Sequence, residues 1–355
     1  MRLGTARGPP PTLPEHERRQ RRRNGKGRPQ MAVHALVVGS LVMDLAFRVA
    51  HRPEAGDLVV ADEFGAFRGG RGYNQAVALA RLGAEVTMIG AVGSDGYGDG
   101  FLQALEREGI DAGRVVQMRG TSTGVAVPLI TPDGRAGFVQ YPGANRYLAP
   151  AHCAELPDCD VLLLQGEVSA ATSLYAARVI HGRGGTVLLR PTPVDGIDHD
   201  LVSNATIVAP NQPEAITLLE RLGADGGLPA LQDPTSASPE ELARALATPE
   251  RGAVVTVGAY DAAWAAPTDG EETAGFVHGP DVATVDTTAA TASFNAALAI
   301  ALAEGAGYEE AAHLACGAGA YAATVRGAEP SLPGRAAVDS LLTEHGRAGF
   351  PPPSR

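Results

Sequence analysis

Strand-like and helix-like runs alternate along most of this 355-residue chain. Short apolar runs that suit buried strands take turns with amphipathic or small-residue runs that suit helices. The strand-like runs are 34–40, 85–91, 160–164, 186–189, 206–209 and 253–257, and the helical runs are 74–82, 98–108, 170–181, 239–247 and 294–304. This alternation predicts an α/β fold with a mostly parallel central sheet and helices on both faces.

Two segments interrupt the alternation. Residues 47–67 and 123–141 each resemble a pair of strands joined by a turn, with no helix between them. Because neither segment contributes a helix to the layers, we expect a small antiparallel sheet that stands off the main one as a lid, from about 45–68 and 122–142. The alternative is that both are only edge hairpins. Residues 223–240, rich in Gly, Pro, Asp and Ser, predict a surface loop.

The charge of the chain is unevenly distributed. The net charge is −11, but residues 1–30 contain nine Lys or Arg against two Glu, so the rest carries −18. An acidic body makes nucleic acid an unlikely main partner. The basic arm predicts a disordered extension, with binding to nucleic acid or an anionic surface as the alternative. A domain over 31–342 and a frayed tail over 343–355 complete the expected organisation.

The sequence shows no pattern typical of a secretory signal or a membrane span, and its cysteines show no pairing pattern. No apolar segment follows the basic arm, so it does not resemble a secretory signal, and no apolar run is long enough to span a membrane. The three cysteines, Cys153, Cys159 and Cys316, are odd in number and lack metal-ligand spacing. This usage suits a reducing cytoplasm.

Two segments near the start of the domain suggest contacts with a polyol. Gly69, Gly70 and Gly72 open a helix and permit close approach of the backbone to a ligand, and Asn74 offers both a donor and an acceptor. Asp44 follows the first strand, where ligands of open α/β sheets gather. Each feature alone also fits a simpler interpretation: a Gly-rich helix entry without a ligand, and a turn or capping aspartate.

Three later segments suggest contacts with a nucleotide. Asn211 and Glu214 follow a strand and suit a hydrated Mg²⁺ near phosphates, although such a pair also caps helices. The run 256–258 (Thr-Val-Gly) is a plausible nucleotide-side turn or a plain strand exit. Residues 286–295 predict a turn that opens a helix, where backbone N–H groups can hold a phosphate.

Taken in order, these segments resemble the ribokinase-like (PfkB) carbohydrate kinase family. The run 69–78 (GGRGYNQAVA) looks like the first signature of the family, and 285–290 (VDTTAA) with 293–295 (SFN) looks like the second. The resemblance covers about 34–342. It implies a three-layer α/β/α sandwich with a lid, a substrate of the ribose type, ATP as co-substrate, Mg²⁺, and homodimers formed through the lid.

The resemblance also implies binding residues. The sugar positions correspond to Asp44, Gly70, Arg71, Asn74 and Glu167. The nucleotide positions correspond to Asn211, Glu214, Thr256 and Gly258. A monovalent-cation (K⁺) site corresponds to Asp286, Thr288, Gly327 and Ser331. Arg71 stands where such proteins often have Lys, which keeps the charge but changes the geometry.

The departures from the family pattern concern the phosphate side. In the turn 289–292, which holds Ala289 and Ala290, the family Gly-Asp is Thr291-Ala292. The resemblance assigns the missing Asp as general base and the missing Gly to the backbone anion hole. A usual Gly in the nucleotide loop is Asp261, and a strand-end Asn is Arg190. Two hypotheses follow: a slow ATP-dependent sugar kinase, or a pseudokinase that acts as a sugar or nucleotide sensor or a regulatory subunit.

Overall fold

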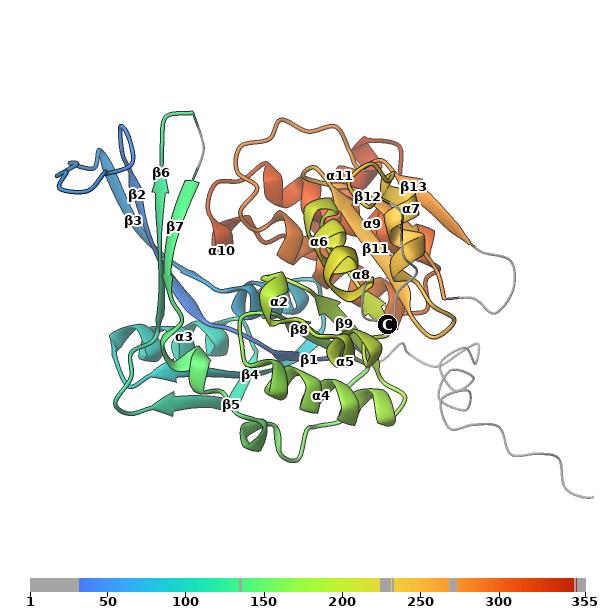
Figure 1. Cartoon of the computed structure of the whole chain (residues 1–355), viewed down its shortest axis with the longest axis horizontal. Helices are drawn as coiled ribbons and strands as arrows, with labels where there is room; N and C mark the ends of the chain where they lie inside the picture. Colours follow the sequence, from blue (N-terminus) through green and yellow to red (C-terminus); the bar gives the residue numbers. More distant parts are fainter. Residues whose placement is uncertain are drawn as a thin grey trace, which may run out of the picture. The chain divides into compact units, whose positions relative to one another are not determined.

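The computed structural model describes residues 32–133, 136–223, 231, 233–267, 273–347 and 349. Within these ranges a nine-stranded sheet has the order β13-β12-β11-β10-β9-β8-β1-β4-β5 (Figure 1). Its strands are β1 (His34–Val38), β4 (Glu85–Gly93), β5 (Asp111–Met118), β8 (Val161–Gln165), β9 (Thr186–Arg190), β10 (Ile207–Val208), β11 (Gly252–Val257), β12 (Asp261–Ala265) and β13 (Ala274–Val277).

The pairs from β5 through β11 are parallel, and β12 and β13 complete one edge as antiparallel strands. The predicted, mostly parallel sheet is therefore confirmed, and each predicted strand forms within a few residues of its expected limits. The predicted basic arm, residues 1–30, lies outside the residues that the structure describes.

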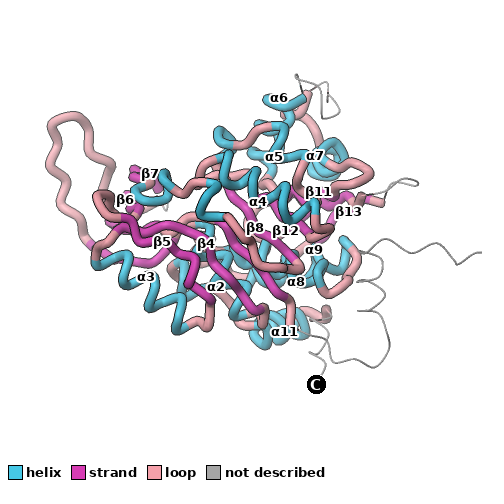
Figure 2. The backbone as a smooth tube through the Cα atoms, turned by 90° about the horizontal axis from the view of Figure 1, so that it is seen from below, coloured by secondary structure: helices cyan, strands magenta, loops and turns pink. Residues whose placement is uncertain are grey.

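Helices cover both faces of this sheet (Figure 2). One face holds α2 (Arg71–Arg81), α3 (Gly96–Arg107), α8 (Ala290–Ala303), α9 (Tyr308–Ala323) and α11 (Arg335–Glu344). The other holds α4 (Ala170–Gly182), α5 (His199–Ser203), α6 (Gln212–Gly223) and α7 (Pro239–Leu246). Short helical turns are η1 (Gly143–Tyr147), η2 (Pro150–Cys153), η3 (Val194–Gly196) and α10 (Ala328–Ser331).

The core is divided by the sheet into two layers. Along β1, Ala35 and Val37 belong to one buried cluster, while Leu36 and Val38 belong to the other. Successive side chains of a strand point to opposite faces, so a strand buried on both faces reads as a continuous apolar run. This explains why the uninterrupted apolar runs of the sequence predicted the central strands correctly.

A second sheet of four strands stands off the first, at the left of Figure 1. Its order is β3 (Glu63–Gly69), β2 (Val42–Arg48), β6 (Gly124–Ile130) and β7 (Ala136–Tyr141). The two predicted hairpins are present, β2 with β3 and β6 with β7, and each is antiparallel. They join through a parallel pairing of β2 with β6, a long-range contact that no local pattern in the sequence encodes.

The C-terminal end of the body extends beyond the predicted boundary at Leu342. Helix α11 runs to Glu344, the imidazole of His345 lies 3.2 Å from the Asp281 carbonyl, and Arg347 donates to the His278 carbonyl. These contacts join the end of α11 to the loop after β13 (Ala274–Val277). Among the described helices, none has the length and apolar character needed to cross a membrane.

Candidate active site

Four residues that the sequence analysis singled out lie at the carboxyl ends of adjacent parallel strands. Glu167 follows β8, Arg190 ends β9, Asn211 follows β10, and Thr256 lies near the end of β11. Asn211 and Thr256 form an isolated parallel bridge. Because parallel strands end at the same edge of a sheet, this edge collects side chains from distant parts of the chain.

Glu167 connects three elements on one side of this edge. Its Oε2 atom accepts a short hydrogen bond from the Ser40 hydroxyl and a 3.0 Å bond from the Arg71 backbone N–H. Its Oε1 atom lies 3.5 Å from the Arg71 Nε and accepts from Gln140 Nε2 at 3.4 Å. Glu167 therefore fixes the β1–β2 turn and the start of α2 against strand β7 of the small sheet.

Asp44 lies in β2, on the same side. A Cβ added to Gly69 would come within 2.2 Å of the Asp44 Oδ2 atom, so the carboxyl group lies directly against this glycine. Burial and the negative charge of Glu167 raise the pKa of Asp44 to about 7. Near neutral pH this carboxyl group can therefore either donate to a ligand hydroxyl or accept from one.

The start of α2 requires glycine. Gly70 has φ +94°, and a Cβ there would lie 2.8 Å from both the Ser40 carbonyl oxygen and the Val42 nitrogen. The close approach places α2 against the β1–β2 turn. In the first turn of α2, Asn74 is buried and its Oδ1 atom has no hydrogen-bond partner among the described residues. An unpaired buried acceptor is costly, which favours a ligand donor at this position.

On the other side, Asn211 and Glu214 form a reciprocal cap at the start of α6. Asn211 Oδ1 accepts from the Glu214 N–H at 2.8 Å, and Glu214 Oε2 accepts from the Asn211 N–H at 2.8 Å. The capping interpretation of this pair is therefore present in the structure. Gly258 follows β11 and has φ +61°, and a Cβ added there would meet no atom within 4 Å. The turn is therefore accessible to a ligand.

Glu214 also holds a buried arginine. Arg190 Nη2 lies 2.7 Å from Glu214 Oε2, and the Thr192 hydroxyl donates to Glu214 Oε1 at 2.6 Å. Both carboxylate oxygens are thus occupied by protein groups. Burial lowers the pKa of Arg190 to about 10. The positive charge of Arg71 also lowers this pKa, whereas the negative charge of Glu214 raises it. The guanidinium therefore remains charged at neutral pH.

The predicted contact of Asn211 and Glu214 with magnesium is an indirect one, through the water shell of the ion, and it stays a prediction. Direct coordination would compete with protein contacts, because Glu214 faces a guanidinium and Asn211 Oδ1 accepts a backbone N–H. In the ranges that the structure describes, no cluster of three or more His, Cys, Asp or Glu side chains could hold a metal ion. The sequence pattern did not indicate the Arg190–Glu214 pair, because the two residues are distant along the chain.

Asp261 lies at the start of β12 and has a structural contact. Its Oδ1 atom accepts from the Gly279 N–H at 2.9 Å, and Oδ2 lies 3.8 Å from His278 Nδ1. The resemblance implied a glycine of the nucleotide loop at this position. The Asp261 side chain instead connects β12 to the loop that follows β13.

The altered turn leads into α8, which begins at Ala290 with Ala289 as its N-cap. The first N–H groups of a helix lack partners within it, so this end can attract an anion. Thr291 and Ala292 are half-buried in the first turn. The methyl group of Ala292 cannot accept a proton, and Thr291 adds a Cβ to the turn.

The four predicted potassium residues come together in part. Asp286 Oδ1 accepts from the Thr288 N–H and hydroxyl, and Oδ2 accepts from the Gly327 N–H at 2.9 Å. Although burial raises it, hydrogen bonds from Thr288 and Gly327 hold the pKa of Asp286 below its usual value. Ser331 is buried and donates to the Ala328 carbonyl. Asp286 is therefore charged at neutral pH, and the potassium site stays a prediction.

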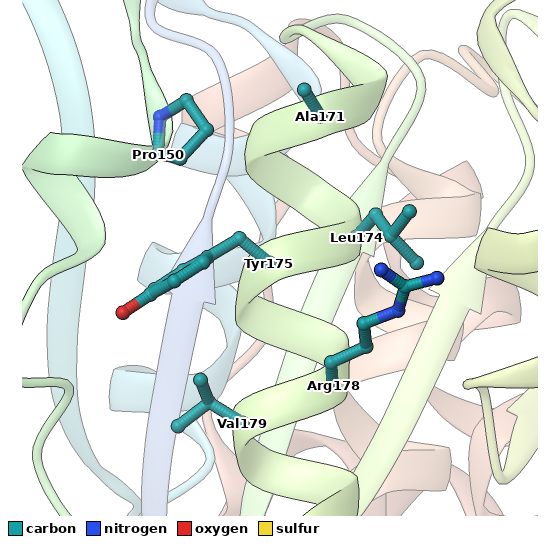
Figure 3. A pocket seen from close by; sticks show the side chains of 6 residues that line it. All are labelled: Pro150, Ala171, Leu174, Tyr175, Arg178 and Val179. Atoms are coloured by element: carbon teal, nitrogen blue, oxygen red, sulfur yellow. The ribbon is translucent and has the colours of Figure 1, made fainter.

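Sequence reasoning missed Ser40 and Gln140 as partners of Glu167. Ser40 follows β1 at the carboxyl edge of the main sheet, so the strand-end rule supplies a signal for it. Gln140 lies in the small sheet, and nothing local in the sequence indicates where that sheet stands. A surface pocket of about 510 Å³ beside α4 is lined by Pro150, Ala171, Leu174, Tyr175, Arg178 and Val179 (Figure 3). None of the predicted site residues lines it.

Comparison with known proteins identifies the family. The pfkB family carbohydrate kinase model matches residues 33–335. Ribokinase of Bacillus subtilis is 31% identical over 311 residues, which cover 86% of this chain and 98% of that protein.

Solved structures agree with this assignment. Ribokinase of Thermotoga maritima has a TM-score of 0.74 and 28% identity, covering 88% of this chain and 99% of that one. Ribokinase of Arabidopsis thaliana, solved with ribose and ATP, has a TM-score of 0.74 and 26% identity at the same coverages. The expected fold class is therefore confirmed, and the chain belongs to the pfkB family of carbohydrate kinases.

Proposed function

We propose that this protein binds a ribose-like sugar and ATP at the carboxyl edge of its main sheet, and that its phosphoryl transfer is weak or lost. One observation carries the proposal: Ala292 stands in the first turn of α8, where the family pattern has a general-base Asp, while the sugar-side residues remain assembled around Glu167. The related Arabidopsis ribokinase, which was solved with ribose and ATP, supports both ligands.

The sugar side supplies binding and orientation. Asp44, with its pKa near 7, forms hydrogen bonds with vicinal hydroxyls, and the unpaired Oδ1 of Asn74 accepts from a further one. Arg71 and Glu167 hold the start of α2 in place. Gly70 lets α2 approach the β1–β2 turn. None of these roles depends on the altered turn at α8.

The nucleotide side orients the phosphates. Thr256 lies near the end of β11 and Gly258 in the turn after it, and the N-terminus of α8, at Ala289 and Ala290, faces the transferred group. Loss of a general base costs about 10²–10⁴-fold in rate. Loss of one oxyanion donor, through the Cβ of Thr291, costs about 10²–10³-fold more. Binding without efficient transfer follows from these two losses.

The predicted ions differ in their roles. A potassium ion would be held by Asp286, Thr288, Gly327 and Ser331, and it would add positive charge near the N-terminus of α8. We assign no step to magnesium, since both oxygens of Glu214 already hold protein groups. The free thiols of Cys153, Cys159 and Cys316 suit the reducing cytoplasm that we propose as the location.

A second function, as a non-catalytic sensor or regulatory subunit, is favoured by the surface of the small sheet. Large apolar side chains are exposed on both of its faces. The strand register places Phe67 and Phe138 on the face of Asp44, and Phe64, Val139 and Tyr141 on the opposite face. Exposed apolar side chains of this size are candidates for an interaction site. We propose that a second copy of the chain binds there, as the family resemblance implies, and that ligand binding is communicated through this sheet.

The proposal is tested by measuring binding and turnover on the same preparation. Calorimetry should show that ATP and a pentose bind, whereas ADP release with a panel of pentoses, hexoses and nucleosides, in K⁺ and Mg²⁺, should stay well below about 1 s⁻¹, the low end of typical kinase rates. Turnover above that rate would contradict the loss of transfer. Absence of binding by every sugar and by ATP would contradict the retained site.

A further inference from the structure

Arg190 occupies a central position in the proposed site. It ends β9, and β9 lies between β8, which leads to Glu167 on the sugar side, and β10, which leads to Asn211 on the nucleotide side. These three strands end at the same edge of the sheet. A phosphate that joins the two ligands would therefore pass beside Arg190.

The bonds of Arg190 leave part of its donor capacity unused. Nη1 donates to the Ala209 carbonyl at 2.9 Å and Nη2 pairs with Glu214 at 2.7 Å. The side chain is only 4% exposed, and its Nε has no hydrogen-bond partner in the described part of the chain. A buried donor without a partner is costly, so an additional acceptor, such as a phosphate oxygen, would stabilise this arrangement.

The same pairing disfavours a divalent cation. A metal at Glu214 would have to displace Arg190 from Oε2 and would then face an unpaired buried guanidinium. An arginine presents a planar set of donors that matches phosphate oxygens in geometry. The donors that a phosphate needs here are therefore already part of the protein.

We propose that Arg190 binds the phosphate oxygens of the nucleotide directly, in place of a divalent metal, so that nucleotide binding does not depend on magnesium. The inference rests on the proposed function, because it assumes that a nucleotide occupies this edge of the sheet. It adds a metal-independent anion site, formed by Arg190 with Glu214 as its positioning residue.

The test is the affinity for ADP, measured by calorimetry with EDTA and with excess Mg²⁺. For the unaltered protein we expect the two dissociation constants to agree within about threefold, well below the tenfold that 1.4 kcal/mol represents. This comparison needs no variant and so does not depend on how a substitution affects folding. Binding only in the presence of Mg²⁺ would overturn the inference and leave the proposed function intact.

A variant then identifies the residue. Arg190→Asn should lose about 10–100-fold in affinity for ADP in EDTA, the size of one hydrogen bond to a charged group, and should become dependent on Mg²⁺ because Glu214 is freed. The matched control is Arg178→Asn, which removes an exposed arginine paired with Asp200 at 2.7 Å and should leave both constants unchanged.

Two other outcomes overturn the inference in distinguishable ways. Binding of ADP to Arg190→Asn but not to the unaltered protein would mean that Arg190 blocks the site. Absence of ADP binding to either protein, with or without Mg²⁺, would contradict the proposed function as well. Circular dichroism of Arg190→Asn establishes that the variant is folded, so that a loss of binding is assigned to the site.

Discussion

At the scale of single residues, the site depends on carboxylates whose surroundings give them different charges. Asp44 is buried beside Glu167 and has its pKa raised to about 7. Asp286 receives hydrogen bonds from Thr288 and Gly327, and its pKa lies below the usual value. The proposed sugar site therefore contains a carboxyl group that titrates near neutrality, whereas Asp286, in the proposed cation site, keeps its charge.

Sugar affinity should consequently depend on pH through Asp44. The raised pKa means that the carboxyl group is protonated below about pH 7 and charged above it. Since a carboxylate accepts stronger hydrogen bonds from hydroxyls than a neutral acid does, affinity for the pentose should rise as pH increases from 6 to 8. Calorimetry at several pH values measures this.

The control for that measurement is Asp44→Asn, which cannot ionise. It should bind the sugar more weakly than the unaltered protein at pH 8 and show a flat profile. An equal slope in the variant would assign the pH dependence to another group and contradict the role of Asp44.

At the scale of elements, the start of α2 is the most constrained junction of the site. Gly70 combines a left-handed backbone with close approach to the Ser40 carbonyl and the Val42 nitrogen. Gly56, in the loop before β3, has the same φ of +94° but nothing within 4 Å of an added Cβ. Comparing a substitution at Gly70 with one at Gly56 therefore distinguishes the cost of backbone strain from the cost of a steric clash.

Gly70→Ala should destabilise the protein more than Gly56→Ala. Both changes meet the left-handed penalty of about 1–2 kcal/mol, but only Gly70→Ala also forces backbone to move, which adds about 1–3 kcal/mol. Urea unfolding gives the two free energies. An equal decrease in the free energy of unfolding for both variants would mean that the backbone around Gly70 can move without cost. The close approach at Gly70 would then not constrain the structure.

The elements also show what the sequence could and could not predict. The strands that lie between two helix layers were predicted, because burial on both faces leaves continuous apolar runs. The parallel pairing of β2 with β6 was not, since hairpins indicate only their own antiparallel pairing. The Arg190–Glu214 pair was missed for the same reason: it joins β9 to α6 through side chains that no local pattern relates.

At the scale of the whole molecule, the small sheet is the surface proposed for self-association. Phe138 and Val139 in its edge strand β7 are 69% and 68% exposed. An edge strand with large exposed apolar side chains is a site for pairing unless something covers it. A second copy of the chain would supply that cover.

The variant with both Phe138→Asp and Val139→Asp should therefore be monomeric, since charged groups disfavour burial in an interface. Sedimentation velocity should show a dimer for the unaltered protein at micromolar concentration and a monomer for the variant. Tyr175→Asp, a charge placed on the outer surface of α4, serves as control and should remain dimeric. A monomeric unaltered protein would contradict association through this sheet.

The central claim is that the protein still binds sugar and ATP. Its phosphoryl transfer is weak or lost because the general-base Asp and the neighbouring Gly are replaced by Ala292 and Thr291. The most direct measurement is the rate of ADP release from the double variant Thr291→Gly, Ala292→Asp, compared with Thr291→Gly alone and with the unaltered protein. The account predicts a rise of at least about 10²-fold in the double variant, the lower limit for a general base, and a smaller effect of the glycine alone. If the double variant binds sugar and ATP but releases ADP no faster than the unaltered protein, the account is contradicted.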